Sequence, residues 1–560
     1  MTLPAHEPTD WTVPRAMRAR ASRSPDRPFV TMEHEGTETF AQCHAHALAM
    51  GRFLQDQGVQ SGQVVAVMAP NSLVAIHAWM GLGCIGAVDA MINTGYRGGP
   101  LEHALNLVQA SVLLVEERFL PVLQASEQRL LHLKTVIHFR LPDTDPGPLP
   151  SFERIALAPL TYRELAPDSE WVPEPGPSFH DLASVIFTSG TSGPAKGVMM
   201  PQAQAYALAL QTVNGLRLEA DDVYYCAHPL FHTAGKFIAL YAALLAGAHV
   251  ALDRMFRADL WVQRLFDLGA TVTLAHGAML EMVHAQPPSP LDGRLRLRRL
   301  MAAPFPRRIA AEFERRFGVR GVEVWGMTEV NNPCWNALDE PLHLGTCGRP
   351  DPAWAEMRVV DPETDLEMPI GEIGEFVVRP VRPFTMMQGY WNAPEATVRA
   401  WRNLWFHTGD AGYVDADGRY HFVDRLGDRI RRRAENIASF DIETAAQSHD
   451  GVRECAAVGV PSGYESDDDI KLFVALRSGQ DLSPPALLTH MASLLPHYMV
   501  PRYIEIIDAL PRTPTNKVRK SDLRAGVIVG RCWDRKAAGV SLRNLMADGS
   551  TSANRLDPSP

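Results

Sequence analysis

Between about residues 60 and 300, short apolar runs alternate along the chain with helical patterns. "VVAVMAP" and "ASVLLVEE" indicate buried strands, "SLVAIHAWMGLG" between them indicates a helix, and "SVIFTSG" indicates a further strand that leads into a glycine-rich loop. Strands that alternate with helices are typical of a largely parallel sheet covered by helices. We therefore predict an α/β fold for this part of the chain.

The pattern changes twice further along the chain. From Ala353, "WAEMRVVDPETDLEMPIGEIGEFVVRP" predicts short antiparallel strands joined by turns. Beyond Arg425 the pattern predicts a smaller basic unit, with "ECAAVGV" and "DIKLFVALR" as paired strands and "LLTHMASLLPHYM" as an amphipathic helix. The polar residues 535–560 are typical of a disordered tail.

Length and composition limit the class of protein. A chain of 560 residues is too long for one hydrophobic core, so we expect at least two domains. The net charge of −10 argues against a broad nucleic-acid-binding surface. The 7 cysteines are scattered without a CxxC pair, which is typical of a reducing compartment. We find no apolar signal peptide, and His77 and Asp89 interrupt the longest apolar region, so we expect a cytoplasmic protein without a transmembrane segment.

The loop "FTSGTSGPAKGVMM", residues 187–200, has the composition of a phosphate-binding loop. Its glycines let backbone N–H groups approach a ligand, its hydroxyls add donors, and Lys196 is its one charge. The familiar phosphate loop of nucleotide hydrolases ends in Gly-Lys-Ser/Thr, whereas this one continues Lys196-Gly197-Val198. The loop therefore predicts a different kind of phosphate chemistry.

Three other patterns are weaker evidence for a binding site. The glycines of Gly81–Gly86 match a dinucleotide-binding fingerprint, but they lie at the end of a predicted helix, so we favour close helix packing. His228 and His232 have a zinc-ligand spacing, but "PLFHTAG" predicts a loop. The Cys-His-Ala-His run at residues 43–46 lacks a partner pair at a ligand spacing. None of the three predicts a site.

The segment "VEVWGMTEVNN" offers a compact set of nucleotide-binding groups. Trp325 could stack on a base, Thr328 could donate to a phosphate, and Glu329 could bind magnesium. The alternative is an ordinary turn at the end of a strand.

In "WFHTGDAGYVDADGRYHFVDR", we expect Thr408-Gly409-Asp410 to close one strand and "DADG" to turn into a strand that ends at Asp424-Arg425. A carboxylate at a strand end is well placed to accept both ribose hydroxyls. Turn chemistry alone explains "DADG" but not the preceding His-Thr-Gly-Asp. The arginine run that follows, at residues 429–433, is on its own typical of a solvated face.

The order and spacing of these motifs, with "RIRRRAENIASFDIE", "TMMQGYWN" and "TPTNKVRK", resemble the adenylate-forming superfamily over about residues 12–525. The resemblance is strongest to the crotonobetaine/carnitine-CoA ligase-like and medium-chain acyl-CoA ligase groups. It implies a large N-terminal domain (12–425) of layered α/β sheets plus a small β-barrel, and a small mobile α+β C-terminal domain (426–530). It also implies ATP-dependent activation of a carboxylic acid to an acyl-adenylate, with pyrophosphate release and transfer to the thiol of coenzyme A.

The resemblance also implies roles for individual residues. The loop that attends the β- and γ-phosphates comprises Thr188, Ser189, Gly190, Thr191, Ser192, Gly193 and Lys196. The adenine and ribose site comprises Ala302, Ala303, Pro304, Trp325, Gly326, Asp410 and Arg425. Thr328 would contact the α-phosphate, Glu329 would hold Mg²⁺, and Lys517 would bridge the carboxylate and the α-phosphate.

The chain departs from the usual pattern of the superfamily near the small domain. Gly427 stands at the hinge, where Asp or Lys is common, and Asn516 precedes Lys517, where glycine is frequent. In the coenzyme A loop, Arg433-Ala434-Glu435, alanine replaces the glycine that lets the pantetheine arm pass. A methyl group there predicts a narrower thiol tunnel.

The resemblance places the acyl pocket at Phe231, His232, Thr233, Gly277, Val330 and Asn331. This partly polar lining favours a short to medium or functionalised acid, and the absence of Asp between His228 and Gly235 disfavours an amino acid. No carrier-protein segment follows the C-terminal domain, so we expect a stand-alone ligase. Three alternatives stay open: transfer to a carrier protein, transfer to an amine, and a non-catalytic nucleotide-binding homologue. The sequence also leaves open a homodimer.

Overall fold

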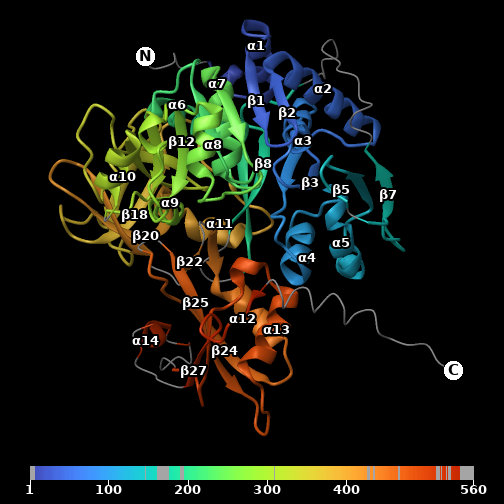
Figure 1. Cartoon of the computed structure of the whole chain (residues 1–560), viewed down its shortest axis with the longest axis vertical. Coiled ribbons are helices and arrows are strands. Elements are labelled where there is room, and N and C mark those ends of the chain that lie inside the picture. The colour runs from blue at the N-terminus through green and yellow to red at the C-terminus, as the bar shows by residue number, and fades with distance from the viewer. Residues whose placement is uncertain are drawn as a thin grey trace. The chain divides into compact units, whose positions relative to one another are not determined.

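The computed structural model describes residues 7–145, 147–160, 176–188, 194–307, 309–425, 429–432, 435–464, 467–511, 518, 520–524, 526 and 531–542 (Figure 1). Contacts divide the chain into two compact units. The large unit comprises Met1–Thr94, Ala104–Thr188 and Lys196–Leu426, and the small unit comprises Gly95–His103, Ser189–Ala195 and Gly427–Pro560.

The first sheet of the large unit has the strand order β16-β15-β14-β13-β12-β10-β11-β1-β2. Its strands are β1 (Pro28–Met32), β2 (Gly36–Thr39), β10 (Val223–Cys226), β11 (His249–Leu252), β12 (Val272–His276), β13 (Arg299–Ala303), β14 (Arg320–Met327), β15 (Asn331–Trp335) and β16 (Arg349–Pro350). The pairs β10–β12, β12–β13 and β13–β14 are parallel, so the carboxyl ends of these strands meet at one edge.

The second sheet has the order β19-β9-β8-β4-β3-β5-β6-β7. Its strands are β3 (Val64–Met68), β4 (Val88–Met91), β5 (Val112–Glu116), β6 (Thr135–Phe139), β7 (Ala156–Pro159), β8 (Leu182–Thr188), β9 (Lys196–Pro201) and β19 (Gly389–Tyr390). The predicted strands are confirmed as β3, β5 and β8, and most pairs are parallel, as expected. The pairs β8–β9 and β9–β19 are antiparallel and flank the glycine-rich loop.

Helices pack against these sheets (Figure 1). They are α1 (Val13–Arg23), α2 (Phe40–Asp56), α3 (Leu73–Cys84), α5 (Leu120–Ser126), α6 (Gln202–Leu216), the π-helix Ala234–Tyr241, α7 (Ala242–Ala246), α8 (Trp261–Leu268), α9 (Gly277–His284), α10 (Ala310–Phe317) and α11 (Pro394–Ala400). Helix α4 (Gly98–Leu107) is divided between the two units at residue 103. A Cβ atom on Gly81 would lie 2.7 Å from the carbonyl oxygen of Ala47, so α2 and α3 approach closely there. Gly81 thus serves helix packing, as predicted for this glycine run.

A third, antiparallel sheet of the large unit has the order β17-β18-β20-β21. Its strands are β17 (Ala355–Val360), β18 (Gly374–Pro380), β20 (Phe406–Val414) and β21 (Tyr420–Arg425). The predicted antiparallel strands and the turn at 415–418 are confirmed. The prediction that Asp410 ends a strand is wrong, because β20 continues to Val414 and pairs Asp410 with Arg425.

The small unit has a sheet of order β24-β25-β26-β27 and a separate β22–β23 hairpin. Its elements are β22 (Arg429–Arg432), β23 (Glu435–Ala438), α12 (Ser439–Gln447), β24 (Val452–Pro461), β25 (Asp468–Leu476), α13 (Pro484–Leu494), β26 (Tyr503–Ile506), α14 (Lys520–Arg524) and β27 (Arg531–Asp534). β24 and β25 pair as predicted. The expectation of disorder from residue 535 is wrong for residues 535–542, because Leu542 is buried in the core of this unit. Residues 543–560 lie outside the described part.

The predicted fold class is confirmed: layered α/β sheets and an antiparallel sheet form the large unit, and the small unit is α+β. The domain limits at 12–425 and 426–530 and the mobility of the small domain stay predictions. In the part of the chain that the structure describes, no helix combines the length and the apolar character that crossing a bilayer requires.

Candidate active site

The carboxyl edge of the first sheet collects the residues predicted to bind nucleotide and acid. β10 leads into the loop with His228, β12 ends at His276, β13 ends at Ala303, and β14 leads into the turn at 328–330. In sheets of this kind, ligands bind in the crevice outside the carboxyl ends of the strands. The fold therefore gives these scattered segments one common edge.

A residue of helix α6 forms hydrogen bonds to the backbone of the turn between β14 and β15. The amide of Gln204 donates to the backbone carbonyls of Thr328, at 2.9 Å, and Glu329, at 3.3 Å. Asn331, with φ +67°, donates its own amide to the carbonyl of Thr385 at 2.9 Å. A Cβ atom on Gly326 would lie 2.0 Å from the carbonyl oxygen of Asn331, so glycine is required there. This bonding fixes the backbone that presents Thr328 and Glu329.

Tyr390 joins two of the predicted site residues. Its hydroxyl donates to Glu329 Oε1 at 3.1 Å, and Lys196 Nζ lies 4.5 Å from the centroid of its ring. Tyr390 reaches both because β19 pairs with β9, opposite Val198, close to the start of that strand at Lys196. The predicted phosphate-binding lysine and the predicted magnesium ligand, from different sheets, thus meet at one aromatic ring.

Sequence analysis missed Tyr390. It lies in "TMMQGYWN", which contributed to the resemblance without a role for any residue. The available signal was an aromatic hydroxyl directly after Gly389. The signal was too weak by itself, because pairing of β19 with β9 depends on segments about 190 residues apart.

Trp325 and Asp410 also lie together. The indole N–H of Trp325 donates to Asp410 Oδ2 at 3.0 Å, and both residues are buried. The ring of Trp325 packs edge-on against Phe376, with centroids 5.3 Å apart. Thr408 fixes the other side of this pair, because its hydroxyl accepts from the backbone N–H of Asp410 at 3.1 Å and donates to the carbonyl of Phe376 at 2.7 Å. The predicted base-stacking and ribose-binding residues therefore form one packed group.

The two ends of the glycine-rich loop are described. Thr188 and Lys196 lie opposite each other across the β8–β9 pair. A Cβ atom on Gly197 would lie 2.8 Å from Val185 Cγ1, so this glycine allows close packing just after the lysine. The loop residues themselves, Ser189, Gly190, Thr191, Ser192 and Gly193, lie outside the described residues.

Three histidines gather near the predicted acyl pocket. The rings of His228 and His276 lie 4.7 Å apart, and those of His232 and His276 lie 6.1 Å apart. Burial lowers the pKa of His228 well below its usual value, with a smaller contribution from the other two histidines, and lowers the pKa of His232 to about 4. His228 and His232 are therefore neutral imidazoles at neutral pH.

The other predicted pocket residues are divided between this loop and the core. Phe231 and Thr233 flank His232, and Gly277 begins α9 directly after His276. Val330 is buried in a hydrophobic cluster, and Asn331 is buried with its amide engaged by backbone carbonyls. Val330 and Asn331 thus hold the turn in place, which sequence analysis did not foresee.

A buried ion pair anchors the helix that follows this loop. Lys236 pairs with Asp89 on β4, and the hydroxyl of Ser184 on β8 donates to the same carboxylate. Lys236 and Ser184 are fully buried, and Asp89 is nearly so. Burial lowers the pKa of Lys236, and the charge of Asp89 opposes that shift. The pair thus ties the π-helix to the second sheet.

Several further predicted residues have incomplete descriptions. Ala302 is buried in the core and Ala303 ends β13, followed by a partly buried Pro304. Of Arg425 only the backbone is described, at the end of β21. Glu435 begins β23. The remaining predicted residues of the small domain, Arg433, Ala434, Lys517 and the hinge residue Gly427, lie outside the described residues.

Family models match most of the chain. Residues 17–391 match the family model of the AMP-binding enzyme, and residues 441–517 match that of the AMP-binding enzyme C-terminal domain. The chain is 30% identical over 479 residues to crotonobetaine/carnitine–CoA ligase of Salmonella paratyphi A, covering 83% of this chain and 89% of the relative. The corresponding ligase of Proteus mirabilis is 29% identical over 477 residues, with the same coverage.

Solved structures share the fold. An o-succinylbenzoate CoA synthetase from Bacillus subtilis superposes with a TM-score of 0.77 at 22% identity, covering 93% of this chain and 98% of that one. An amide bond synthetase from Marinactinospora thermotolerans superposes with a TM-score of 0.76 at 25% identity, covering 92% and 99%. Since the AMP-binding model alone spans well over half of the residues, the chain belongs to the AMP-binding enzyme family.

Proposed function

We propose that this protein is an AMP-forming acid–thiol ligase. In the first half-reaction a carboxylate attacks the α-phosphorus of ATP, which forms an acyl-adenylate and releases pyrophosphate. In the second, the thiol of coenzyme A attacks the acyl carbon, which forms a thioester and releases AMP. The main structural support is that Tyr390 contacts both Glu329 and Lys196. The relatives named as CoA ligases support the choice of acceptor.

The chemistry of the first step is mainly electrostatic. A carboxylate that approaches an anionic phosphate is repelled, so positioned cations and donors must stabilise the charge that develops. We assign Lys196 and the glycine-rich loop to the departing phosphates, Thr328 to the α-phosphate, and Lys517 to the bridge between carboxylate and α-phosphate. Trp325 and Asp410 would hold the base and the ribose. Because the leaving group is pyrophosphate, a tight grip on the γ-phosphate is not required.

The residues present fit a magnesium ion. Mg²⁺ prefers oxygen ligands and is commonly bound by one or two carboxylates together with substrate phosphates. Glu329 supplies one buried carboxylate, and Tyr390 orients it from the side. Glu329 would therefore hold the ion, whose charge would neutralise part of the triphosphate.

The second step requires the small domain. We propose that it rotates about a hinge near Gly427, so that Lys517 leaves the site and the loop Arg433-Ala434-Glu435 approaches it. The limits 12–425 and 426–530 belong to this proposal. In this proposal, the methyl group of Ala434 narrows the tunnel through which the pantetheine arm of coenzyme A reaches the acyl-adenylate.

The acid is proposed to be short to medium in length and to carry a second polar group. The neutral imidazoles of His228 and His232, beside His276, support this class of acid. Each neutral ring can donate one hydrogen bond and accept one from a polar group of the substrate, without carrying a charge itself. His228 Nε2 is buried without a hydrogen-bond partner among the described residues, and a long unbranched fatty acid would not supply one.

Transfer to an amine is a second candidate. The similarity to an amide bond synthetase, at 25% identity over most of both chains, favours it, as does the methyl group of Ala434. A carrier-protein thiol would be a third acceptor that uses the same adenylate.

The test is pyrophosphate release from ATP and Mg²⁺ with a panel of acids. The panel should contain short-chain and medium-chain acids, carnitine, crotonobetaine, o-succinylbenzoate and anthranilate. We expect release with at least one functionalised acid, thioester formation when coenzyme A is added, and strong loss of release in Asp410→Ala. Amide formation with added amines, and no thioester, would replace the thiol assignment. ATP binding without release for any acid would contradict the ligase and favour a nucleotide-binding homologue.

A further inference from the structure

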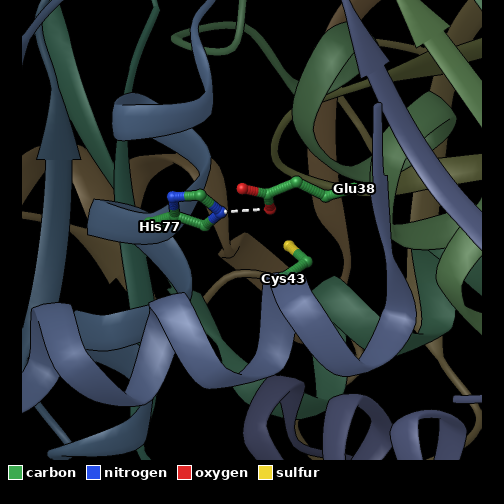
Figure 2. Close-up of side chains that lie close together, drawn as sticks. All are labelled: Glu38, Cys43 and His77. Atoms are coloured by element: carbon green, nitrogen blue, oxygen red, sulfur yellow. Dashed lines mark hydrogen bonds and ion pairs between the residues drawn. The ribbon is translucent and has the colours of Figure 1, made fainter. Parts of the chain in front are cut away.

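The cysteine and histidine run at residues 43–46 acquires partners through the fold. Cys43 and His46 lie one turn apart on α2, and His77 and Met80 lie one turn apart on α3. Glu38 lies on β2, directly before α2. Figure 2 shows the side chains of Glu38, Cys43 and His77 pointing toward one another. Sequence spacing did not reveal this group, because it joins three elements.

The distances within the group are short. The ring of His77 bonds Glu38 Oε2 through Nε2 at 2.7 Å, and the ring of His46 bonds Glu38 Oε1 through Nδ1 at 2.8 Å. The thiol of Cys43 lies 3.9 Å from the thioether sulfur of Met80. One candidate ligand atom from each of Glu38, Cys43 and His77 lies within 4.8 Å of the others. Ligand atoms around a tetrahedral zinc ion are about 3–4 Å apart, so small shifts would suffice.

The group is buried and carries a negative charge. Cys43 and His77 are fully buried, and Glu38 is 8% exposed. Each oxygen of the Glu38 carboxylate is hydrogen-bonded to a histidine ring, an arrangement that favours its ionised form. Within the described residues, the ion partners of Glu38 are these two histidines. A divalent cation that displaces the thiol proton of Cys43 would make the whole group neutral, which lowers the cost of burying it.

The surrounding packing holds the group in place. The side chain of Thr39 caps α2 and that of Gln42 bonds back to Thr39, which fixes the junction between Glu38 and Cys43. The close approach of Gly81 to α2 fixes the distance between the two helices. The potential ligands thus project from rigid elements, as a metal site requires.

We propose that Glu38, Cys43 and His77 form a structural zinc site that ties β2 to α2 and α3, with His46 holding the second oxygen of the Glu38 carboxylate. A thiolate, an imidazole and a carboxylate are a borderline-soft donor set that suits Zn²⁺ and not Mg²⁺. On binding, a Zn–S bond forms and the thiol proton of Cys43 passes to solvent. None of these residues has a role in the proposed ligase reaction, so the site stands independently of that activity.

The experiment measures metal in the full-length protein after expression with added zinc and removal of loosely bound ions. We expect close to one zinc per chain in wild type, at least a tenfold loss in Cys43→Ser, and no loss in Cys84→Ser. Cys84 is a matched control, because it is also buried and lies at the end of α3 outside the group. Substitution with Co²⁺ should give a thiolate-to-metal charge-transfer band in wild type and Cys84→Ser.

Two measurements on wild-type protein keep the test valid if Cys43→Ser fails to fold. We expect zinc to raise the melting temperature of chelator-treated wild type, and Co²⁺ to give the charge-transfer band. A carboxylate site such as Glu329 cannot give this band. Absence of both effects, with less than a tenth of a zinc per chain, would overturn the proposal. Stoichiometric copper in place of zinc would overturn the identity of the ion, and equal metal loss in Cys84→Ser would overturn the ligand assignment.

Discussion

The indole N–H of Trp325 donates a hydrogen bond to the carboxylate of Asp410 at 3.0 Å. The bond links the ring that we assign to the base with the carboxylate that we assign to the ribose. Because both groups are buried, a change in one will affect the position of the other.

We predict that Trp325→Phe weakens ATP binding, because phenylalanine keeps a ring but lacks the N–H donor. The bond contributes about 1.5–3 kcal/mol to the folded state and positions Asp410. Without it the carboxylate is less well placed for the ribose, so the Kd for ATP should rise severalfold. Calorimetric titration of ATP measures this. Trp401→Phe is the control, because Trp401 packs against Phe406 and not against Asp410. If the effects of Trp325→Phe and Asp410→Ala simply add in the double variant, the two residues do not act together.

We predict that Tyr390→Phe raises the Mg²⁺ concentration for half-maximal pyrophosphate release severalfold. The change removes the hydroxyl that orients Glu329 but keeps the ring beside Lys196. Glu329→Gln should produce the same kind of shift, only larger. Tyr390→Leu, which removes the ring as well, should also weaken ATP binding in the absence of Mg²⁺. An unchanged magnesium dependence in Tyr390→Phe would remove the positioning role from Tyr390.

The sequence predicted local structure better than contacts between distant segments. The apolar runs of β3, β5 and β8 were predictable because each strand is buried and bounded by turn residues. The position of Asp410 within β20 was not, because a strand that continues through Thr-Gly-Asp depends on pairing with β18 and β21. These partners override the turn preference of glycine and aspartate.

In the candidate site, too, single residues were more predictable than the contacts between them. Trp325 and Asp410 were predictable separately as motif residues, whereas the bond between them spans 85 residues and needs the fold. Val330 and Asn331 have side chains of a type that could line a pocket. Asn331 bonds to Gln204 and Thr385, and Val330 packs in a hydrophobic cluster, contacts that the sequence did not reveal. Their place in the acyl pocket stays a prediction.

We predict that Lys236→Met destabilises the protein by about 3–5 kcal/mol, because it leaves the carboxylate of Asp89 buried without its cation. The double variant Asp89→Leu/Lys236→Met should recover most of this loss. Urea unfolding followed by circular dichroism measures both. Arg399→Met is the control, because Arg399 and its partner Glu395 are largely exposed and such pairs contribute less than about 1 kcal/mol. A double variant as unstable as Lys236→Met would contradict the role of the unpaired charge.

We predict that the protein loses stability as the pH falls from about 6.5 toward 4. The pKa of His232 is lowered from 6.5 to about 4, so the unfolded state binds more protons in this window and stability rises with pH. At pH 5 this histidine alone accounts for at most about 2 kcal/mol, and His228 shifts in the same direction. Urea unfolding at pH 7.5 and pH 5 measures the slope. His232→Asn should flatten it, and an unchanged slope would contradict the burial of a neutral imidazole.

We predict that Lys517→Ala strongly reduces acyl-AMP formation but leaves the second half-reaction near the wild-type rate. Loss of one electrostatic contact to the reacting centre costs roughly 10²–10³ in rate, and a rotating domain would bring Lys517 to the site in the first step only. Single-turnover kinetics should therefore show slow pyrophosphate release, yet normal conversion of supplied acyl-AMP and coenzyme A to thioester. Ala434→Gly is the converse control: it should speed thioester formation and leave pyrophosphate release unchanged. Equal damage to both steps by Lys517→Ala would rule out rotation between half-reactions as the role of the small domain.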